Sequence, residues 1–167
     1  MPANILLILT DQQSSSMMSC SGNSFVHTPA MDMLAAEGVR FNRGYCANPV
    51  CIPSRFSIMT GRMPSEIGMI SNYLHIKPVP EPVKKAGLGW LMRGAGYDAV
   101  YAGKEHLPKM RAADLGFDYI CRDERDELAE TCAGFLAEHR KNPFFLVASF
   151  INPHDICYMA IRDFAET

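Results

Sequence analysis

A short stretch in the first third of the chain gathers several residue types that do chemistry in proteins. Its cysteine could act as a nucleophile or metal ligand once it is deprotonated. Cys46 lies close enough in sequence to form a disulfide or a redox pair with it, and free cysteines are also often simply buried. None of these interpretations gives the neighbouring proline, arginine, threonine and glycine a role. Residues 51 to 62 read Cys51-Ile52-Pro53-Ser54-Arg55-Phe56-Ser57-Ile58-Met59-Thr60-Gly61-Arg62.

This stretch resembles the signature of type I sulfatases, a family of the alkaline phosphatase superfamily, at every defined position of C-x-P-S-R-x-x-[apolar]-[apolar]-T-G-R. The resemblance implies that Cys51 is not used as a thiol. In this family a formylglycine-generating enzyme, or an anaerobic sulfatase-maturating enzyme, reads the C-x-P-x-R segment before folding and oxidises the cysteine to formylglycine. The hydrated aldehyde is a geminal diol: one oxygen attacks sulfur, and the other later loses its proton and expels sulfate.

The elements that must position this stretch alternate between strand and helix patterns. Continuous apolar runs predict parallel strands, covered on both faces, over residues 4–10, 97–102 and 144–150. Helices are expected over 30–36 behind Thr28 and Pro29, near 54–61, over 83–93, and over 124–140 behind Asp123, with a proline-rich loop at 63–82. The fold class is therefore α/β, a mostly parallel sheet with helices on both faces, as in alkaline phosphatase-like proteins.

Polar residues follow each predicted strand. Asp11 comes after the first strand, Lys104 and His106 after the second, and His154 after the third. Singly, these residues could cap a turn, be solvated, or form a structural hydrogen bond. Since sites in open parallel sheets assemble outside the carboxyl ends of the strands, we expect them to converge on one pocket together with Cys51 and Arg55.

Further segments extend the resemblance over most of the chain, at residues 4–11, 28–41, 103–107 and 150–154. The resemblance implies that Cys51 is the nucleophile and that Arg55 stabilises its hydrated aldehyde. It also implies that Lys104 and His106 bind the sulfate oxygens, and that His154 binds sulfate or assists protonation of the leaving group.

The resemblance implies a metal site as well. Asp11 stands at the position of the first calcium ligand, and Cys51 is a ligand after its conversion. Gln12 occupies the place where many relatives have a second aspartate, and its amide oxygen would ligate without adding charge. Hard oxygen ligands favour calcium, or magnesium, over softer metals.

Composition excludes some classes of binding partner and bears on the location of the protein. The chain has 167 residues, of which 48% are hydrophobic and 20% charged, and a net charge of −2, so it is one domain without the basic footprint of a nucleic-acid-binding protein. No apolar run is long enough to span a membrane. Residues 5–9 lack the flanks of a signal peptide, and the cysteines lack that export context, so a cytoplasmic location is expected. Loss of a leader would make it periplasmic or secreted.

The resemblance also implies that much of the enzyme lies elsewhere. Family members have a catalytic part several times longer, with a second pair of metal ligands and a further sulfate-binding lysine downstream. We therefore expect residues 1–167 to be the N-terminal portion of a sulfatase catalytic domain that ends within a helix at 165–167 and leaves a sheet edge open. The expected substrate is a sulfate-ester small molecule or glycan. A phosphonate or phosphate ester hydrolase and a non-catalytic truncated remnant are the alternatives.

Overall fold

A computed structural model describes residues 2–72, 78–158 and 162 of the chain. Its centre is one sheet of four strands in the order β1-β4-β2-β3, and every neighbouring pair is parallel. The three predicted strands are therefore confirmed as members of one sheet, with the third lying between the other two. The strands are β1 (Ile5–Asp11), β2 (Asp98–Gly103), β3 (Asp118–Cys121) and β4 (Phe144–Pro153).

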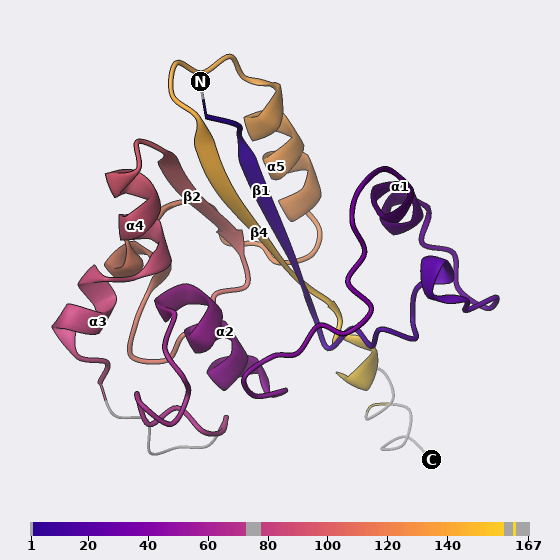
Figure 1. The fold of residues 1–167 in the computed structure, drawn as a ribbon, viewed down its shortest axis with the longest axis horizontal. Coiled ribbons are helices and arrows are strands. Elements are labelled where there is room, and N and C mark those ends of the chain that lie inside the picture. Colours follow the sequence, from indigo (N-terminus) through magenta and orange to yellow (C-terminus); the bar gives the residue numbers. More distant parts are fainter. Residues whose placement is uncertain (1, 73–77, 159–161, 163–167) are drawn as a thin grey trace.

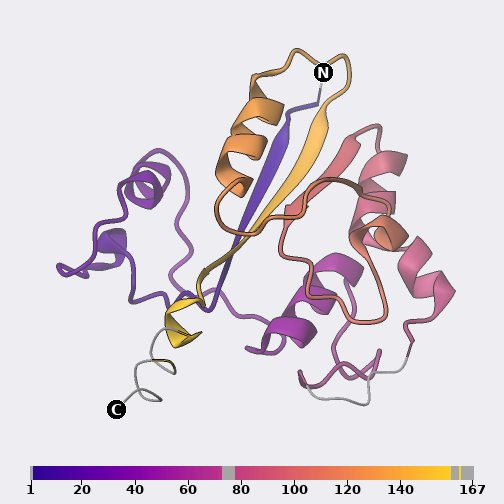
Figure 2. The same cartoon turned by 180° about the vertical axis from the view of Figure 1, so that it is seen from behind.

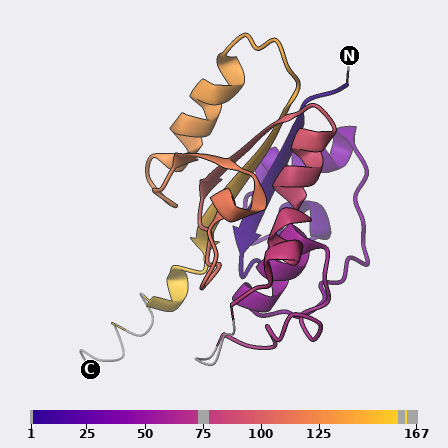
Figure 3. The same ribbon diagram turned by 90° about the vertical axis from the view of Figure 1, so that its left-hand side faces the viewer.

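Helices cover both faces of the sheet, as the sequence predicts. Helices α2 and α4 pack on one face and α5 on the other, which Figure 3 shows with the sheet between them. Figures 1 and 2 show α1 and its flanking turn set apart from the sheet, beyond β1. The α-helices are α1 (Pro29–Glu37), α2 (Cys51–Thr60), α3 (Glu81–Lys85), α4 (Leu88–Gly94) and α5 (Leu128–Ala137). Two 3-10 turns, η1 (Ser19–Ser21) and η2 (Ala112–Leu115), join them.

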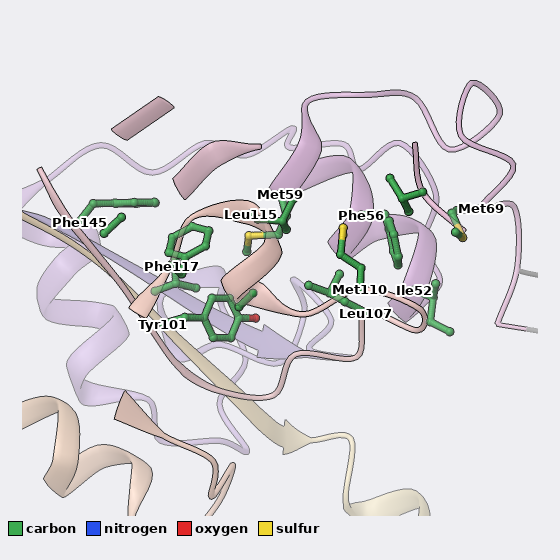
Figure 4. Packing of buried hydrophobic residues seen from close by; sticks show 14 residues of the cluster. Ile52, Phe56, Met59, Met69, Tyr101, Leu107, Met110, Leu115, Phe117 and Phe145 are labelled. Atoms are coloured by element: carbon green, nitrogen blue, oxygen red, sulfur yellow. The ribbon is translucent and has the colours of Figure 1, made fainter. Parts of the chain in front are cut away.

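Alternating residues of the two central strands supply the two halves of the core. Tyr101 and Val147 belong to the same buried cluster as Phe56 of α2, and all three are fully buried. Figure 4 shows Tyr101 and Phe56 within this cluster. Leu146, the neighbour of Val147, points the other way and packs with Leu128 of α5. Each such buried side chain stabilises the fold by about 1.5–3 kcal/mol, so the core fixes β2, β4 and α2 relative to one another.

The helix predicted over 83–93 is wrong as a single element, because it is divided into α3 and α4. Gly87 and Gly89 lie at this division. A side chain at either position would collide with Leu115: an added Cβ would lie 2.5 Å from Leu115 Cδ2 at Gly87 and 2.5 Å from the Leu115 carbonyl oxygen at Gly89. The glycines therefore allow η2 to approach the start of α4 closely, and this contact interrupts the helix.

The region before α5 also differs from the prediction. The helix expected over 124–140 begins only at Leu128, because the Asp123 carboxylate accepts hydrogen bonds from the backbone N–H groups of Arg125 and Glu127 and holds a turn there. Strand β3 was not predicted. It has only four residues and pairs along one side, so its sequence carries little periodic signal.

Strand β1 is not covered on both faces in the described part of the chain, which corrects another expectation. It is an edge strand, and Ile5, Leu6 and Ile8 are 38%, 41% and 49% exposed. Leu6 and Ile8 share one face of the strand, whereas Ile5, Leu7 and Leu9 share the other, on which Leu7 and Leu9 pack against the core. The helix expected at 165–167 lies outside the described residues. Among the described helices, none is long and apolar enough to cross a membrane.

Candidate active site

The polar cluster at the carboxyl edge of the sheet is centred on Asp11, the last residue of β1. Its Oδ2 atom lies 3.0 Å from Arg55 Nη2 and 2.8 Å from Lys104 Nζ. Arg55 comes from α2, and Lys104 follows β2 directly. Parallel pairing brings the ends of β1 and β2 to the same edge of the sheet (Figure 1), and core packing places α2 over it.

The charges in this cluster do not balance. Asp11, Arg55 and Lys104 are each 5–7% exposed, so one carboxylate faces two buried cations. Burial alone would raise the pKa of Asp11, but hydrogen bonds from Lys104 and Arg55 outweigh it and hold the pKa below its ordinary value. The carboxylate is therefore ionised at neutral pH, and the cluster keeps a net positive charge that attracts an anion.

Cys51 occupies the first position of α2, with its Sγ 3.5 Å from Asp11 Oδ1. The N-cap residue Val50 makes no side-chain cap, and the Asn72 side chain instead accepts a hydrogen bond from Ile52 N at 3.0 Å. The N-terminus of α2, where backbone N–H groups favour negative charge, thus lies beside the positive cluster.

An open hollow of about 670 Å³ lies over these residues. Cys46 also lines this hollow, but both Cys46 and Cys51 are free thiols, so the disulfide alternative is not formed. His154 reaches the hollow from the end of β4, and its Nδ1 atom is buried without a hydrogen-bond partner among the described residues. The lining residues include Asp11, Gln12, Cys46, Cys51, Ser54, Arg55, Asn72 and His154.

Three side chains in the hollow could hold a metal ion. Ligand atoms of Asp11, Cys51 and His154 all lie within 4.8 Å of one another. The buried, unpartnered nitrogen of His154 and the carboxylate oxygen that faces Cys51 fit a cation between them. Gln12 lines the same hollow, but its side chain is exposed and its amide nitrogen donates to Cys157 Sγ at 3.2 Å.

His106 is the predicted site residue that lies apart. It is exposed and lines a neighbouring hollow of about 580 Å³ formed by residues 105–111 and 114. Desolvation, followed by the positive charges of Lys104 and Arg55, lowers the pKa of His106 below its ordinary value. The imidazole is therefore neutral at neutral pH and close enough to sense the charged cluster.

Two buried hydroxyl groups in the site escaped the sequence analysis. Ser149 and Tyr101 are both fully buried, and both donate hydrogen bonds to the Lys104 carbonyl oxygen, at 2.8 and 2.7 Å. The one sequence feature that could have identified Ser149 is that it is a polar residue in an otherwise apolar strand, on the face that packs against α2. Asn72 was missed as well, because its contact with α2 bridges distant parts of the chain.

Comparisons with known proteins agree with this geometry. A family model described as Sulfatase matches residues 3–166. N-acetylgalactosamine-6-sulfatase of Sus scrofa is 36% identical over 128 residues, and an ulvan-active sulfatase of Formosa agariphila is 36% identical over 125 residues. Each match covers 70% of this chain but only 24% and 23% of the relatives, so the chain spans about a quarter of their length.

Solved structures share the same fold. A structure in complex with its substrate D-glucosamine-2-N,6-O-disulfate has a TM-score of 0.77 at 27% identity, over 91% of this chain and 35% of that one. Phosphonate monoester hydrolase of Agrobacterium radiobacter, with a TM-score of 0.71 at 19% identity over 92% and 41% of the two chains, shares the fold alone. With the family model matching nearly every residue and the signature cysteine placed at the head of α2 beside a buried cationic cluster, this chain belongs to the sulfatase family.

Proposed function

We propose that the protein containing this chain hydrolyses sulfate esters with a formylglycine made from Cys51, and that a sulfated sugar is its substrate. The observation that carries this proposal is the placement of Cys51 at the N-terminus of α2, 3.5 Å from an Asp11 carboxylate that also holds Arg55 and Lys104. Cys51, Arg55 and the N-terminus of α2 line one hollow, and Lys104 lies directly behind it on Asp11, an arrangement that suits a tetrahedral anion.

The side chains of this chain divide the work. Lys104 and Arg55 stabilise the charge on the sulfuryl oxygens, and their contacts with Asp11 hold both side chains in place. His154 faces the same hollow and holds or transfers a proton at the departing oxygen. His106 is neutral and lies beside the charged cluster, where it donates or accepts a hydrogen bond at the edge of the site.

A divalent cation belongs to the proposal, with calcium as the favoured ion and magnesium as the second. Asp11 would hold it, together with the oxygens of the converted Cys51, and Gln12 is the weaker candidate. When bound, such an ion supplies Lewis-acid polarisation of the reacting oxygens. Hard oxygen donors at this position are the reason for choosing calcium or magnesium.

Modification of Cys51 must precede folding, which makes a maturation enzyme part of the proposal. Pro53 and Arg55, which would be read together with Cys51, are buried in α2 beneath the core. An enzyme that recognises these side chains has access to them only in an extended segment. A formylglycine-generating or an anaerobic sulfatase-maturating enzyme is the partner that fits.

Support for a sugar substrate comes from the relatives. One is named for N-acetylgalactosamine 6-sulfate chemistry, another for activity on ulvan, and a solved structure holds a disulfated glucosamine. The open hollow of about 670 Å³ leaves Cys51 accessible to a bulky ester.

The test uses the complete reading frame, co-expressed with a maturation enzyme. Mass spectrometry of the peptide spanning Cys51 should show conversion of the thiol to the aldehyde, and sulfate-ester turnover should depend on that conversion. Cys51→Ala should abolish turnover, and Cys51→Ser should nearly abolish it, because neither can form the geminal diol without a serine-reading enzyme. Full activity of Cys51→Ala would rule out the mechanism.

A substrate panel separates sulfate from phosphorus chemistry. The phosphonate monoester hydrolase with the same fold makes phosphonate and phosphate esters the necessary comparison. A kcat/KM at least about tenfold higher for sulfated sugars supports the proposal, since that ratio corresponds to about 1.4 kcal/mol of transition-state preference. Preference for a phosphonate ester would assign the protein to the alternative.

A further inference from the structure

We propose that Ser149 is a positioning residue that orients both cations of the sulfate site through its buried hydroxyl group. This inference rests on the proposed function, since it concerns how Arg55 and Lys104 reach the substrate. Ser149 lies in β4 with 0% exposure, beneath the hollow rather than on it. It therefore acts through its neighbours and not through the reacting atoms.

The hydroxyl of Ser149 joins the Arg55 guanidinium to the backbone of Lys104. Its Oγ accepts a hydrogen bond from Arg55 Nη1 at 2.6 Å and donates one to the Lys104 carbonyl oxygen at 2.8 Å. Arg55 Nη1 also donates to the same carbonyl at 2.9 Å, which closes a triangle of three contacts. One hydroxyl from β4 thus links α2 to the residue that follows β2.

Arg55 is held at both ends of its guanidinium group. Nη1 contacts Ser149 and the Lys104 carbonyl, and Nη2 contacts Asp11 at 3.0 Å. Because a guanidinium is planar with its donors in a fixed fork, these contacts define its plane as well as its position. Without the Ser149 acceptor, Nη1 would lose its shortest contact, and the group could tilt about its bond to Asp11.

Lys104 is held through its backbone. Lys104 N donates to the Ser149 carbonyl at 2.7 Å, so the serine contacts both the N–H and the C=O of the lysine. The preceding Gly103 has φ 85°, and a Cβ there would lie 2.2 Å from the Ser149 carbonyl oxygen. This close, left-handed turn at the end of β2 aims the lysine side chain at Asp11, which it contacts at 2.8 Å.

Tyr101 provides an internal comparison. Its hydroxyl also donates to the Lys104 carbonyl, at 2.7 Å, and it is equally buried. Its hydroxyl also has side-chain hydrogen-bond interactions with Ser149 and Arg55. Without it, however, the Lys104 carbonyl keeps two other donors, and Arg55 Nη1 keeps its 2.6 Å contact with Ser149. If Ser149 is a positioning residue, loss of its hydroxyl should therefore lower kcat more than loss of the Tyr101 hydroxyl does. If both buried hydroxyls are purely structural, the two losses of kcat should be similar.

The experiment measures steady-state kinetics of the matured full-length protein with a sulfated monosaccharide. Ser149→Ala should lower kcat about 10- to 100-fold and change KM by less than about threefold, because a hydrogen bond to a charged group contributes on that scale and here acts through orientation. Ser149→Cys keeps the branching of the side chain with a somewhat larger atom that accepts hydrogen bonds weakly, and it should lose kcat similarly if the alanine variant folds poorly. Tyr101→Phe should lose less than about fivefold.

Val147→Ala is the matched control. It lies on the same strand and faces the same core, so it lowers thermal stability without removing a polar contact, and its kcat should stay at the wild-type value. Formylglycine content, measured by mass spectrometry, should be equal in all variants. A wild-type kcat in both Ser149 variants, or a Tyr101→Phe loss equal to that of Ser149→Ala, would overturn the positioning role.

Crystal structures keep this test separate from the proposed function. In Ser149→Ala the Arg55 guanidinium should be displaced or adopt several conformers, while Asp11 keeps its place. If the wild type has no sulfatase turnover, the proposed function fails. An Arg55 side chain unchanged in Ser149→Ala would then still overturn the positioning role, and a displaced one would support it.

Discussion

The charges of individual residues give the carboxyl edge of this sheet a net positive charge. Asp11 contacts two cations, Arg55 and Lys104, and the three side chains are 4–8% exposed. Buried charges of this kind are tolerated because they are paired and hydrogen-bonded, and the pairing does not by itself stabilise the fold. The arrangement fixes two cations near Cys51, as the proposed sulfate site requires.

The first prediction concerns Asp11→Asn in the full-length protein without metal. The substitution keeps the shape of the side chain but leaves two buried cations without their counter-charge, which should lower the free energy of unfolding by about 3–5 kcal/mol. Urea denaturation measures the loss.

Asp118→Asn serves as its control. Asp118 pairs with Arg93 at 2.6 Å but is 74% exposed. Removal of a pair in solvent should cost less than about 1 kcal/mol. Equal, small losses at both positions would show that the Asp11 cluster is not an obligate charge balance.

Residue types that carry chemistry could be identified from the sequence, and residues that hold them could not. Cys51, Arg55 and Lys104 stand in spaced motifs, and Asp11 directly follows an apolar run. Ser149 instead stands within an apolar run. Its role depends on a tertiary contact, because α2 packs over β4 and brings Arg55 to the serine hydroxyl. Arg55 and Ser149 are 94 residues apart in the sequence, so their contact leaves no local sequence pattern from which it could be predicted.

At the scale of the elements, close approach decides where helices begin and end. The periodicity of residues 83–93 predicts a helix, and the chain does form helices there, but η2 lies against Gly87 and Gly89 and interrupts them. Asp123 likewise has the residue type of an N-cap, yet it closes a turn before α5. In both cases a tertiary or local hydrogen-bonding contact overrides a correct helical propensity.

The second prediction compares two glycines of α4. At Gly89 an added Cβ would lie 2.5 Å from the Leu115 carbonyl oxygen and 2.8 Å from the Gly116 carbonyl carbon, both backbone atoms that cannot rotate away. Gly89→Ala should therefore destabilise the protein by about 1–3 kcal/mol, despite the better helix propensity of alanine.

Gly94, in the same helix, meets nothing within 4 Å of an added Cβ. Gly94→Ala should leave stability unchanged or raise it by up to about 1 kcal/mol. Thermal melts should show a lower midpoint for Gly89→Ala and an equal or higher midpoint for Gly94→Ala than for the wild type. A Gly89→Ala variant at least as stable as Gly94→Ala would mean that η2 does not press against α4 as the structure has it.

At the scale of the whole molecule, the described residues form one parallel sheet of four strands whose edge strand β1 is left partly uncovered. In the described residues β1 is an edge strand with exposed apolar side chains, while α1 stands apart from the sheet (Figure 2). That β1, β2 and β4 share one parallel sheet could be predicted from their apolar runs and the intervening helices. The exposure of β1 could not, since an apolar run does not reveal which neighbours are supplied by this stretch of sequence.

The metal shell shows the same incompleteness. Among residues 2–72, 78–158 and 162, the one grouping that could hold an ion comprises Asp11, Cys51 and His154. Calcium takes six to eight oxygen ligands, and this grouping offers a single carboxylate. The curated relatives are about four times as long as the matched region, which leaves room for further ligands beyond it in those proteins.

The third prediction is that residues 1–167 alone, even with Cys51 converted to formylglycine, give no measurable sulfate-ester turnover. Without a tightly held cation, Lys104 and Arg55 must stabilise all of the developing charge, and Asp11 already neutralises one of them. Isothermal titration of the purified chain should show calcium binding weaker than that of the full-length protein by at least about 100-fold, because each missing carboxylate ligand removes both a contact and a charge. The same chain carrying Cys51→Ala is the matched blank for turnover. Calcium-dependent hydrolysis by the converted chain above that blank would show that these residues already form a complete site.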